Sequence, residues 1–96
     1  MPDETGAKQL AESLIEQKLA ACVNILSPCQ SVYNWQGHLE HTCEIPLMIK
    51  TDQAHYAALE TAIINAHPYE LPEIISINVN GGLPMYLQWV NAQLST

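Results

Sequence analysis

Histidine and cysteine side chains are the groups of this 96-residue sequence best suited to chemistry, because both bind transition metals. His67 ends a helical pattern and is followed by Glu70 and Glu73, whose carboxylates can supply oxygen ligands. Cys22 opens a short apolar run and is a candidate soft ligand for Cu(I). The alternatives are a His67 that ends a helix and bonds a backbone carbonyl, and a Cys22 that packs as a small core residue. The residues therefore predict either a metal site at His67, Glu73 and Cys22 or structural roles for them.

A second group of potential ligands is formed by His38, His41 and Cys43. On an extended strand His41 and Cys43 point to the same face, where they could chelate an ion together. We interpret the group instead as a solvated hairpin with incidental histidines. His55, early in a helical pattern, is expected to be exposed, and Cys29 is expected in an exposed loop.

Composition excludes several classes of partner. The chain has ten acidic residues, three lysines and a formal charge of −7. Three cations are too few to bind nucleic acid or an anionic membrane. It contains no apolar run near the roughly 20 residues of a membrane helix and does not begin like a signal peptide. Three cysteines, an odd number without CxxC spacing, favour a reducing cytoplasm over a disulfide framework. A mean hydropathy near zero favours an oligomer.

The elements that must position these side chains alternate between helix and strand. Apolar residues at three- and four-residue spacing predict helices, and alternating or short apolar runs predict strands. The expected helices are 3–20, 51–66 and 84–94, and the expected strands are 22–26, 31–35, 39–51 and 73–80. Asp3 is expected to cap the first helix, and Pro46 to interrupt its strand. The order α-β-β-β-α-β-α predicts one α+β domain over residues 1–96, with helices on one face of an antiparallel sheet.

Short motifs along the whole chain resemble the CutA1 family, the divalent-cation tolerance proteins. They are Pro2–Glu4, Leu19–Ile25, Tyr33-x-Trp35-x-Gly37, Ile49–Thr51, His67–Tyr69, Pro72–Glu73 and Tyr86–Trp89. The resemblance implies a ferredoxin-like βαββαβ fold with a C-terminal helix, a homotrimer related in architecture to PII signalling proteins, and a link to copper tolerance. Some members pair two histidines where this chain has Ala66 and His67, so one of the two ligands is absent here.

The sequence departs from the family pattern at its beginning. Family members have an apolar strand before the Pro-Asp-Glu motif, and Met1 stands where that strand would end. We therefore expect the family's first strand to be missing from this chain, together with a metal-linked cysteine that some members carry on it. Because that strand lies mid-sheet in the family, its loss would leave two ladders of backbone groups unpaired.

The trimer implied by the family suggests a use for one lysine and four aromatic residues. Lys50 could line a cleft between subunits that holds a small anion or an aromatic compound, together with Tyr33, Trp35, Tyr86 and Trp89. The alternative is that Lys50 pairs with a carboxylate such as Glu73 of another subunit while the aromatic residues fill the interface. Glu44 and Glu60 are expected to be solvated or interface charges.

Two functions are left open. The first is a non-enzymatic, cytoplasmic, homotrimeric protein of metal tolerance, which binds copper in preference to zinc and needs no organic cofactor. The second is a PII-like sensor or scaffold whose cleft between subunits binds a small molecule or a partner protein. An enzyme is not expected, because the sequence has no Ser-His-Asp order and no phosphate-binding loop.

Overall fold

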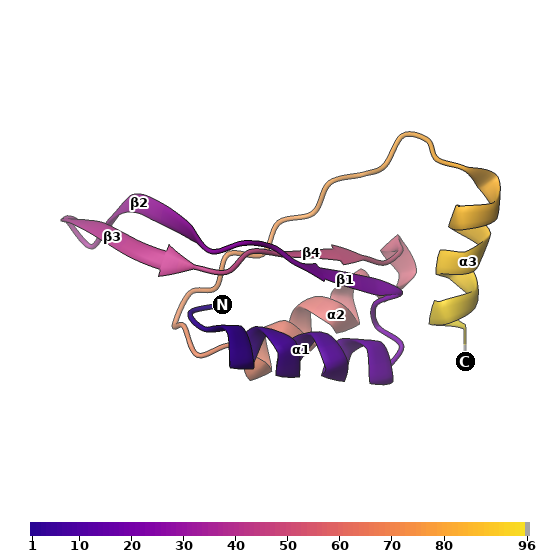
Figure 1. Ribbon diagram of the computed structural model, residues 1–96, viewed down its shortest axis with the longest axis horizontal. Coiled ribbons are helices and arrows are strands. Elements are labelled where there is room, and N and C mark those ends of the chain that lie inside the picture. The colour runs from indigo at the N-terminus through magenta and orange to yellow at the C-terminus, as the bar shows by residue number, and fades with distance from the viewer. Residues whose placement is uncertain (96) are drawn as a thin grey trace.

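Four strands form two antiparallel ladders in the computed structural model, which describes residues 1–95; the last residue of the predicted 1–96 domain lies outside them. Strand β1 (Cys22–Ile25) pairs with β4 (Leu47–Lys50), and β2 (Cys29–Trp35) pairs with β3 (His38–Glu44). Since the chain runs directly from β1 to β2 and from β3 to β4, the two ladders continue one another as a long, bent hairpin (Figure 1). Cys29 therefore opens a strand, and the prediction that it lies in a loop is wrong.

The hairpin tip follows from its two turn residues. Gln36 and Gly37 both have positive φ angles, 52° and 84°, the combination of a two-residue type I′ turn whose twist matches that of paired strands. Asn34 supports the turn, because its side-chain oxygen accepts a hydrogen bond from the Gly37 N–H at 3.1 Å. In the sequence, the Gln-Gly pair after the alternating residues 31–35 predicts a turn, and that turn is confirmed.

Pro46 divides the expected strand 39–51 into β3 and β4, as its missing N–H predicted. The Pro46 carbonyl still accepts a hydrogen bond from Leu26 at 3.0 Å. Beside it, Ile45 exchanges two hydrogen bonds with Met1: the Ile45 N–H donates to the Met1 carbonyl at 2.7 Å, and the Met1 amino group donates to the Ile45 carbonyl at 3.1 Å. The amino terminus is thereby attached at the junction between the two ladders.

Helix α1 (Glu4–Glu16) begins as predicted, with Asp3 accepting a hydrogen bond from the Gly6 N–H at 2.6 Å. It ends four residues earlier than the predicted Ala20. The reason is Lys18, whose positive φ of 58° stops the helix while the following N–H groups bond back to the carbonyl of Leu14. The apolar spacing of the sequence predicts a buried face that includes Ile15; Ala7, Leu10, Ala11 and Leu14 are buried as expected, but Ile15 is 41% exposed.

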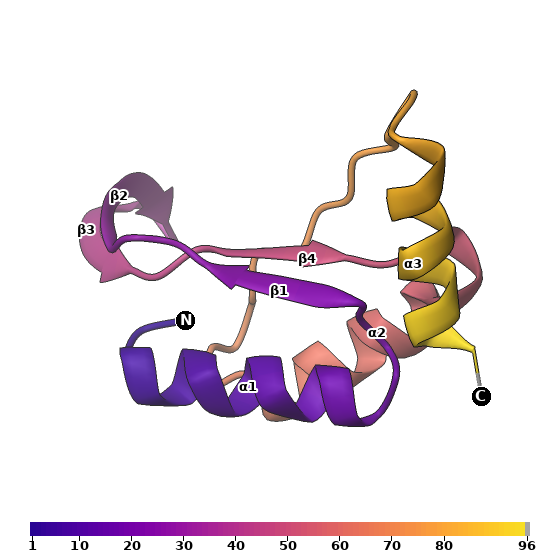
Figure 2. The same ribbon diagram turned by 45° about the vertical axis from the view of Figure 1, so that its right-hand side comes forward.

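Helix α2 (Gln53–Ala66) lies with α1 on one face of the β1–β4 ladder (Figures 1 and 2). The two helices enclose the main core, to which the strands add Val23, Leu47 and Ile49; its buried members are Leu10, Leu14, Ala20, Leu59 and Ile63. The apolar spacing of the sequence predicts that α2 buries Tyr56, Leu59, Ile63 and Ala66. Tyr56 is only half-buried and Ala66 is exposed, because the core contacts the middle of this helix rather than its end.

The prediction of a strand at Glu73–Asn80 is wrong for the residues that the structure describes. The segment is extended, but none of its backbone groups joins a ladder, and β4 pairs with β1 alone. Its alternation is nevertheless retained: Ile74 packs against the main core, and Asn78 accepts a hydrogen bond from the Gln53 side chain at 3.0 Å. The other side of the segment is exposed, 77% for Ile75 and 86% for Ile77. A strand needs a neighbouring edge as well as an alternating sequence, and no described residue supplies that edge.

Helix α3 (Pro84–Leu94) begins at Pro84 as predicted and stands at the far end of the β1–β4 ladder (Figure 2). Val90 and Leu94 pack on Ala21 in a small cluster separate from the main core. Lys18 adds one contact, donating to the Ser95 carbonyl at 3.3 Å. No helix within residues 1–95 is both long and apolar enough to cross a membrane.

Candidate functional site

His67 is the C-cap of α2, and its ring is held by the next turn of the chain. The backbone N–H of His67 donates to the Ile63 carbonyl at 2.8 Å. The ring Nδ1 of His67 accepts a hydrogen bond from the backbone N–H of Tyr69 at 3.1 Å. The rings of His67 and Tyr69 also lie 4.7 Å apart at an angle of 58°. The structural role of His67 is thus to accept from a backbone N–H, and not to bond a carbonyl as the sequence suggested.

The protonation of the His67 ring follows from these contacts. Burial lowers the pKa of His67, the positive amino terminus of Met1 lowers it further, and the negative charge of Glu44 opposes both. Because Nδ1 accepts a hydrogen bond, the proton of the neutral ring is on Nε2. A metal ion would have to displace either the Tyr69 N–H from Nδ1 or the proton from Nε2.

The other two predicted ligands do not join His67. Cys22 is half-buried in β1, with its Sγ 4.0 Å from the side-chain oxygen of Asn24, and Glu73 is exposed in the extended segment. No three His, Cys, Asp or Glu side chains gather in a metal-binding arrangement within residues 1–95. A site at His67, Glu73 and Cys22 is therefore not assembled inside one protomer.

The hairpin histidines occupy positions expected of a solvated hairpin. His41 and Cys43 are exposed on one face of β3, opposite Val32 and Gln30 of β2. His38 pairs with Trp35 beside the turn. The face shared by His41 and Cys43 is as predicted.

Three of the five predicted cleft residues come together within one chain. The Lys50 Nζ lies 5.8 Å from the ring centre of Tyr86, and the rings of Tyr86 and Trp89 stack 5.7 Å apart at 25°. Both aromatic residues are exposed. The other two, Tyr33 and Trp35, lie on β2 at the opposite end of the molecule (Figure 1). A single protomer therefore presents a lysine and two aromatic rings on one surface, without the hairpin residues.

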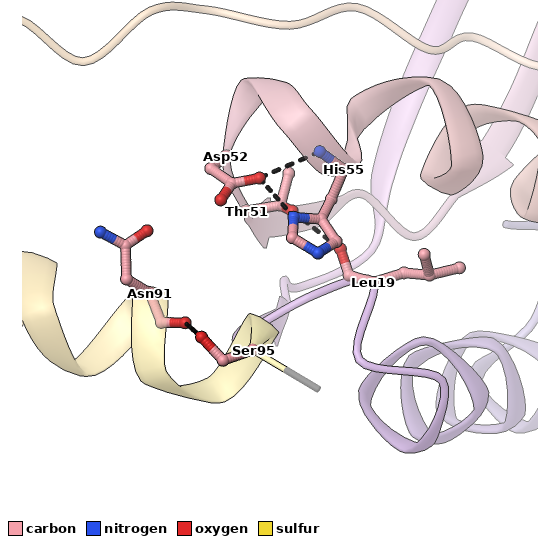
Figure 3. A network of polar contacts seen from close by, with 6 residues as sticks. All are labelled: Leu19, Thr51, Asp52, His55, Asn91 and Ser95. Carbon is pink, nitrogen blue, oxygen red and sulfur yellow. Dashed lines mark hydrogen bonds and ion pairs between the residues drawn. The ribbon is translucent and has the colours of Figure 1, made fainter.

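A carboxylate–imidazole pair that was not predicted from the sequence lies at the start of α2. Asp52 is the N-cap, and its Oδ1 accepts hydrogen bonds from the His55 N–H at 3.0 Å and from the His55 Nδ1 at 2.6 Å (Figure 3). Next to it, the Thr51 hydroxyl donates to the Leu19 carbonyl at 2.8 Å and ties this helix start to the end of α1. His55 was expected to be exposed, but its side chain is 30% exposed and that of Asp52 is 33%. An Asp three residues before a His at a helix start was the available signal.

The charge of Asp52 is favoured by this arrangement. Burial acts to raise the pKa of Asp52, but the hydrogen bonds from the ring and backbone of His55, with the positive charge the ring can carry, hold that pKa below its usual value. Asp52 therefore accepts hydrogen bonds as a carboxylate, and the proton between the two side chains belongs to Nδ1 of His55.

Glu44 is less exposed to solvent than a free surface charge. It is half-buried, and its carboxylate accepts a hydrogen bond from Thr42 at 2.9 Å. Burial raises the pKa of Tyr69, and the negative charge of Glu44 raises it further.

Comparison with known proteins agrees with this fold. A family model described as the CutA1 divalent ion tolerance protein matches residues 1–93. The chain belongs to the CutA1 family. A divalent-cation tolerance protein CutA of Pectobacterium atrosepticum is 45% identical over 93 residues, which cover 97% of this chain and 84% of the relative. The protein CutA homolog of Xenopus laevis is 46% identical over 89 residues, which cover 93% of this chain but only 59% of that longer protein.

Solved structures of the CutA1 family have the same architecture. CutA of Xylella fastidiosa matches with a TM-score of 0.94 and 44% identity, over 98% of this chain and 90% of that one. CutA of Archaeoglobus fulgidus, described as a periplasmic divalent cation tolerance protein, matches with a TM-score of 0.94 and 33% identity, over 98% and 91%. The predicted α+β fold, antiparallel and ferredoxin-like, is therefore confirmed.

Proposed function

We propose that this CutA1-family chain acts in divalent-metal tolerance, copper above all, as a homotrimer that binds metal ions weakly or between subunits. One observation carries the proposal: the family model of the CutA1 divalent ion tolerance protein matches residues 1–93. Within residues 1–95 of a single protomer, no three potential ligands gather. A metal site of ordinary affinity then requires ligands from a second copy. His67, Glu73 and Cys22 are candidates for such a shared site, with zinc as the second metal.

The exposed apolar surface supports self-association. Ile75, Ile77, Val79 and Met85 all lie between α2 and the first turn of α3, and each is at least 77% exposed. Four such highly exposed apolar side chains within one segment are typical of an interface. The number three for the assembly comes from the family resemblance.

The proposal can be tested by measuring assembly and metal binding together. Sedimentation equilibrium should give a trimer, and calorimetric titration with Cu(II), Cu(I) and Zn(II) should give weaker binding when the assembly is dissociated by an Ile77→Asp substitution. His67→Ala tests the His67 ligand, with His38→Ala on the hairpin as the matched control. A stable monomer that binds the three ions as well as the assembled protein does would contradict the proposal.

The proposal includes a cytoplasmic location and no catalytic step. Cys22, Cys29 and Cys43 are all free, which suits a reducing compartment. The charge of −7 argues against nucleic acid or anionic membrane as partners. Because the Archaeoglobus relative is described as periplasmic, fractionation of cells that express the native gene is the direct test.

A second candidate function is favoured by the surface of Lys50, Tyr86 and Trp89. A cation beside two stacked, exposed rings suits a small aromatic anion, and Lys50 forms no ion pair with a carboxylate within residues 1–95. This is the PII-like sensor alternative, here with a site contained in one protomer. In a Trp35→Phe background, Trp89 fluorescence should change on titration with benzoate, and the change should be lost in Lys50→Met but kept in Lys8→Met. Equal responses of the two lysine variants would contradict it.

A further inference from the structure

Two histidines of the described chain carry the proton of the neutral ring on different nitrogens. The carboxylate of Asp52 can only accept hydrogen bonds, so the His55 Nδ1 at 2.6 Å carries a proton, and the lone pair of the neutral ring is on Nε2. The reverse holds at His67, where Nδ1 accepts from Tyr69 and the proton is on Nε2. Of these two histidines, His55 is therefore the one that offers a lone pair at the outer nitrogen of its ring.

The Asp52–His55 pair has the form of a supported metal ligand. Histidines that bind metals usually donate the second ring N–H to a carboxylate or a carbonyl, which fixes the ring and makes the other nitrogen more basic. Here the same carboxylate also accepts the His55 backbone N–H, so that the ring is held to its own helix start (Figure 3). With about a third of each side chain exposed, the site is accessible from solvent. The hydrogen bonds of His55 within residues 1–95 involve its backbone N–H and Nδ1, and none involves Nε2.

We propose that His55, oriented by Asp52, is the first protein ligand for Cu(II) in each protomer, binding through Nε2. Imidazole nitrogen suits copper and zinc, and copper binds more tightly at a given nitrogen site. The remaining positions of the ion are filled by water or by a second copy, because no third ligand lies nearby in the described chain. This inference rests on the proposed metal binding, but it does not depend on the trimer.

The first test needs no metal. Long-range ¹⁵N–¹H NMR spectra of the imidazole rings at a pH where both are neutral should show the proton on Nδ1 of His55 and on Nε2 of His67. The opposite protonation of the His55 ring would overturn the proposal directly.

The second test follows copper itself, in the full chain with Cys22, Cys29 and Cys43 replaced by serine so that thiolates neither bind nor reduce it. Substoichiometric Cu(II) should broaden the ring signals of His55 before those of His38, His41 and His67. His55→Gln should abolish the tightest binding step. Asp52→Asn, which keeps a good helix cap, should weaken that step about tenfold, the loss expected when the partner of a ligating histidine is removed. His38→Gln, on the exposed hairpin, is the matched control and should leave the step unchanged.

The outcomes separate this site from the proposed function. Copper that broadens His38 or His41 first, or binds equally well to His55→Gln, would overturn the His55 site and leave a role in metal tolerance intact. Binding at His55 in a protein whose deletion leaves cells equally tolerant of copper would support the site and contradict the proposed function.

Discussion

Two regions of the molecule have regularly spaced apolar residues, but only one of the two regions buries most of them. In residues 1–66, α1, α2 and the β1–β4 ladder cover one another and enclose Leu14 completely. In residues 71–83, apolar residues alternate just as regularly, yet Ile77 is 86% exposed. The difference is the presence of a second surface, because an apolar face is buried only where another element is available to cover it.

The C-terminal region is attached to the rest by few contacts. Ile74 touches the main core, Gln53 bonds Asn78, and Leu94 and Val90 pack on Ala21. We therefore expect residues 1–66 to carry most of the stability of the isolated chain and residues 71–95 to depend on assembly for much of theirs.

The largest effect is expected from Leu14→Ala. Leu14 is fully buried, and truncating such a residue leaves a cavity that costs about 3 kcal/mol in the free energy of unfolding. Urea denaturation followed by circular dichroism measures it. Leu39→Ala on the exposed hairpin is the control and should change stability by less than about 0.5 kcal/mol. Similar losses for the two variants would refute the difference in packing.

A smaller and local effect is expected from Leu94→Ala. Leu94 is 1% exposed, but the cluster it shares with Ala21 and Val90 is separate from the main core. The substitution should lower the local stability of α3 by about 2 kcal/mol. Hydrogen exchange should accelerate at the amides of α3 and stay nearly unchanged in α1. Equal acceleration in both helices would show that the two regions unfold as one.

Ile77→Asp should act on assembly and leave the fold of the protomer unchanged. A charge on this exposed face should weaken self-association at least tenfold, about 1.4 kcal/mol, while the circular dichroism spectrum is retained. Gln9→Asp, on the exposed side of α1, is the matched control for added charge. Sedimentation profiles that Ile77→Asp does not alter would argue against an interface at this segment.

Asp52→Ala should cost about 1 kcal/mol at neutral pH, the usual value of a lost helix cap. The pKa of Asp52 is lowered on folding, so its contribution is complete above the unfolded value near 3.9 and is lost as the pH falls through the lower folded value. Melting temperatures from pH 7 to pH 2 should therefore converge for variant and parent. A gap that persists at the lowest pH would contradict the charged cap.

The smallest effect, within about 0.5 kcal/mol, is expected from His67→Gln. The pKa of His67 is lowered on folding, so the stability that comes from its neutral form is present above the unfolded value near 6.5 and is lost as the pH falls through the folded value. The variant should show a shallower fall in stability below pH 6.5. An unchanged slope would mean that another group is responsible.

Much of the local structure could be predicted because its causes lie within a few residues. Asp3 caps the next turn, Pro46 lacks an N–H, and Pro84 suits a first helical position. The Asp52–His55 pair is equally local, but it was not predicted, because His55 was expected to be an exposed residue. The early end of α1 was also missed, because a left-handed Lys18 leaves no clear mark in a sequence.

The candidate sites were predictable as residue types but not as geometries. The sequence showed that His67 ends a helix, yet only the fold shows that Tyr69 donates to its Nδ1. In the same way, the motifs include Lys50, Tyr86 and Trp89, but the packing of α3 decides that Tyr86 lies beside both Lys50 and Trp89. A side chain's type sets which bonds it can make, whereas its partner depends on where the backbone turns.

The sequence by itself determined the family, the α+β class, the helix starts and the alternation of residues 73–80, since each depends on residue type and short-range spacing. Only the tertiary structure decided that the alternating segment joins no ladder in the described chain, that Met1 bonds Ile45, and that three cleft residues gather without the other two. The physical reason is that strand pairing and side-chain clusters join residues far apart in the chain, and their formation depends on which surfaces the fold brings together.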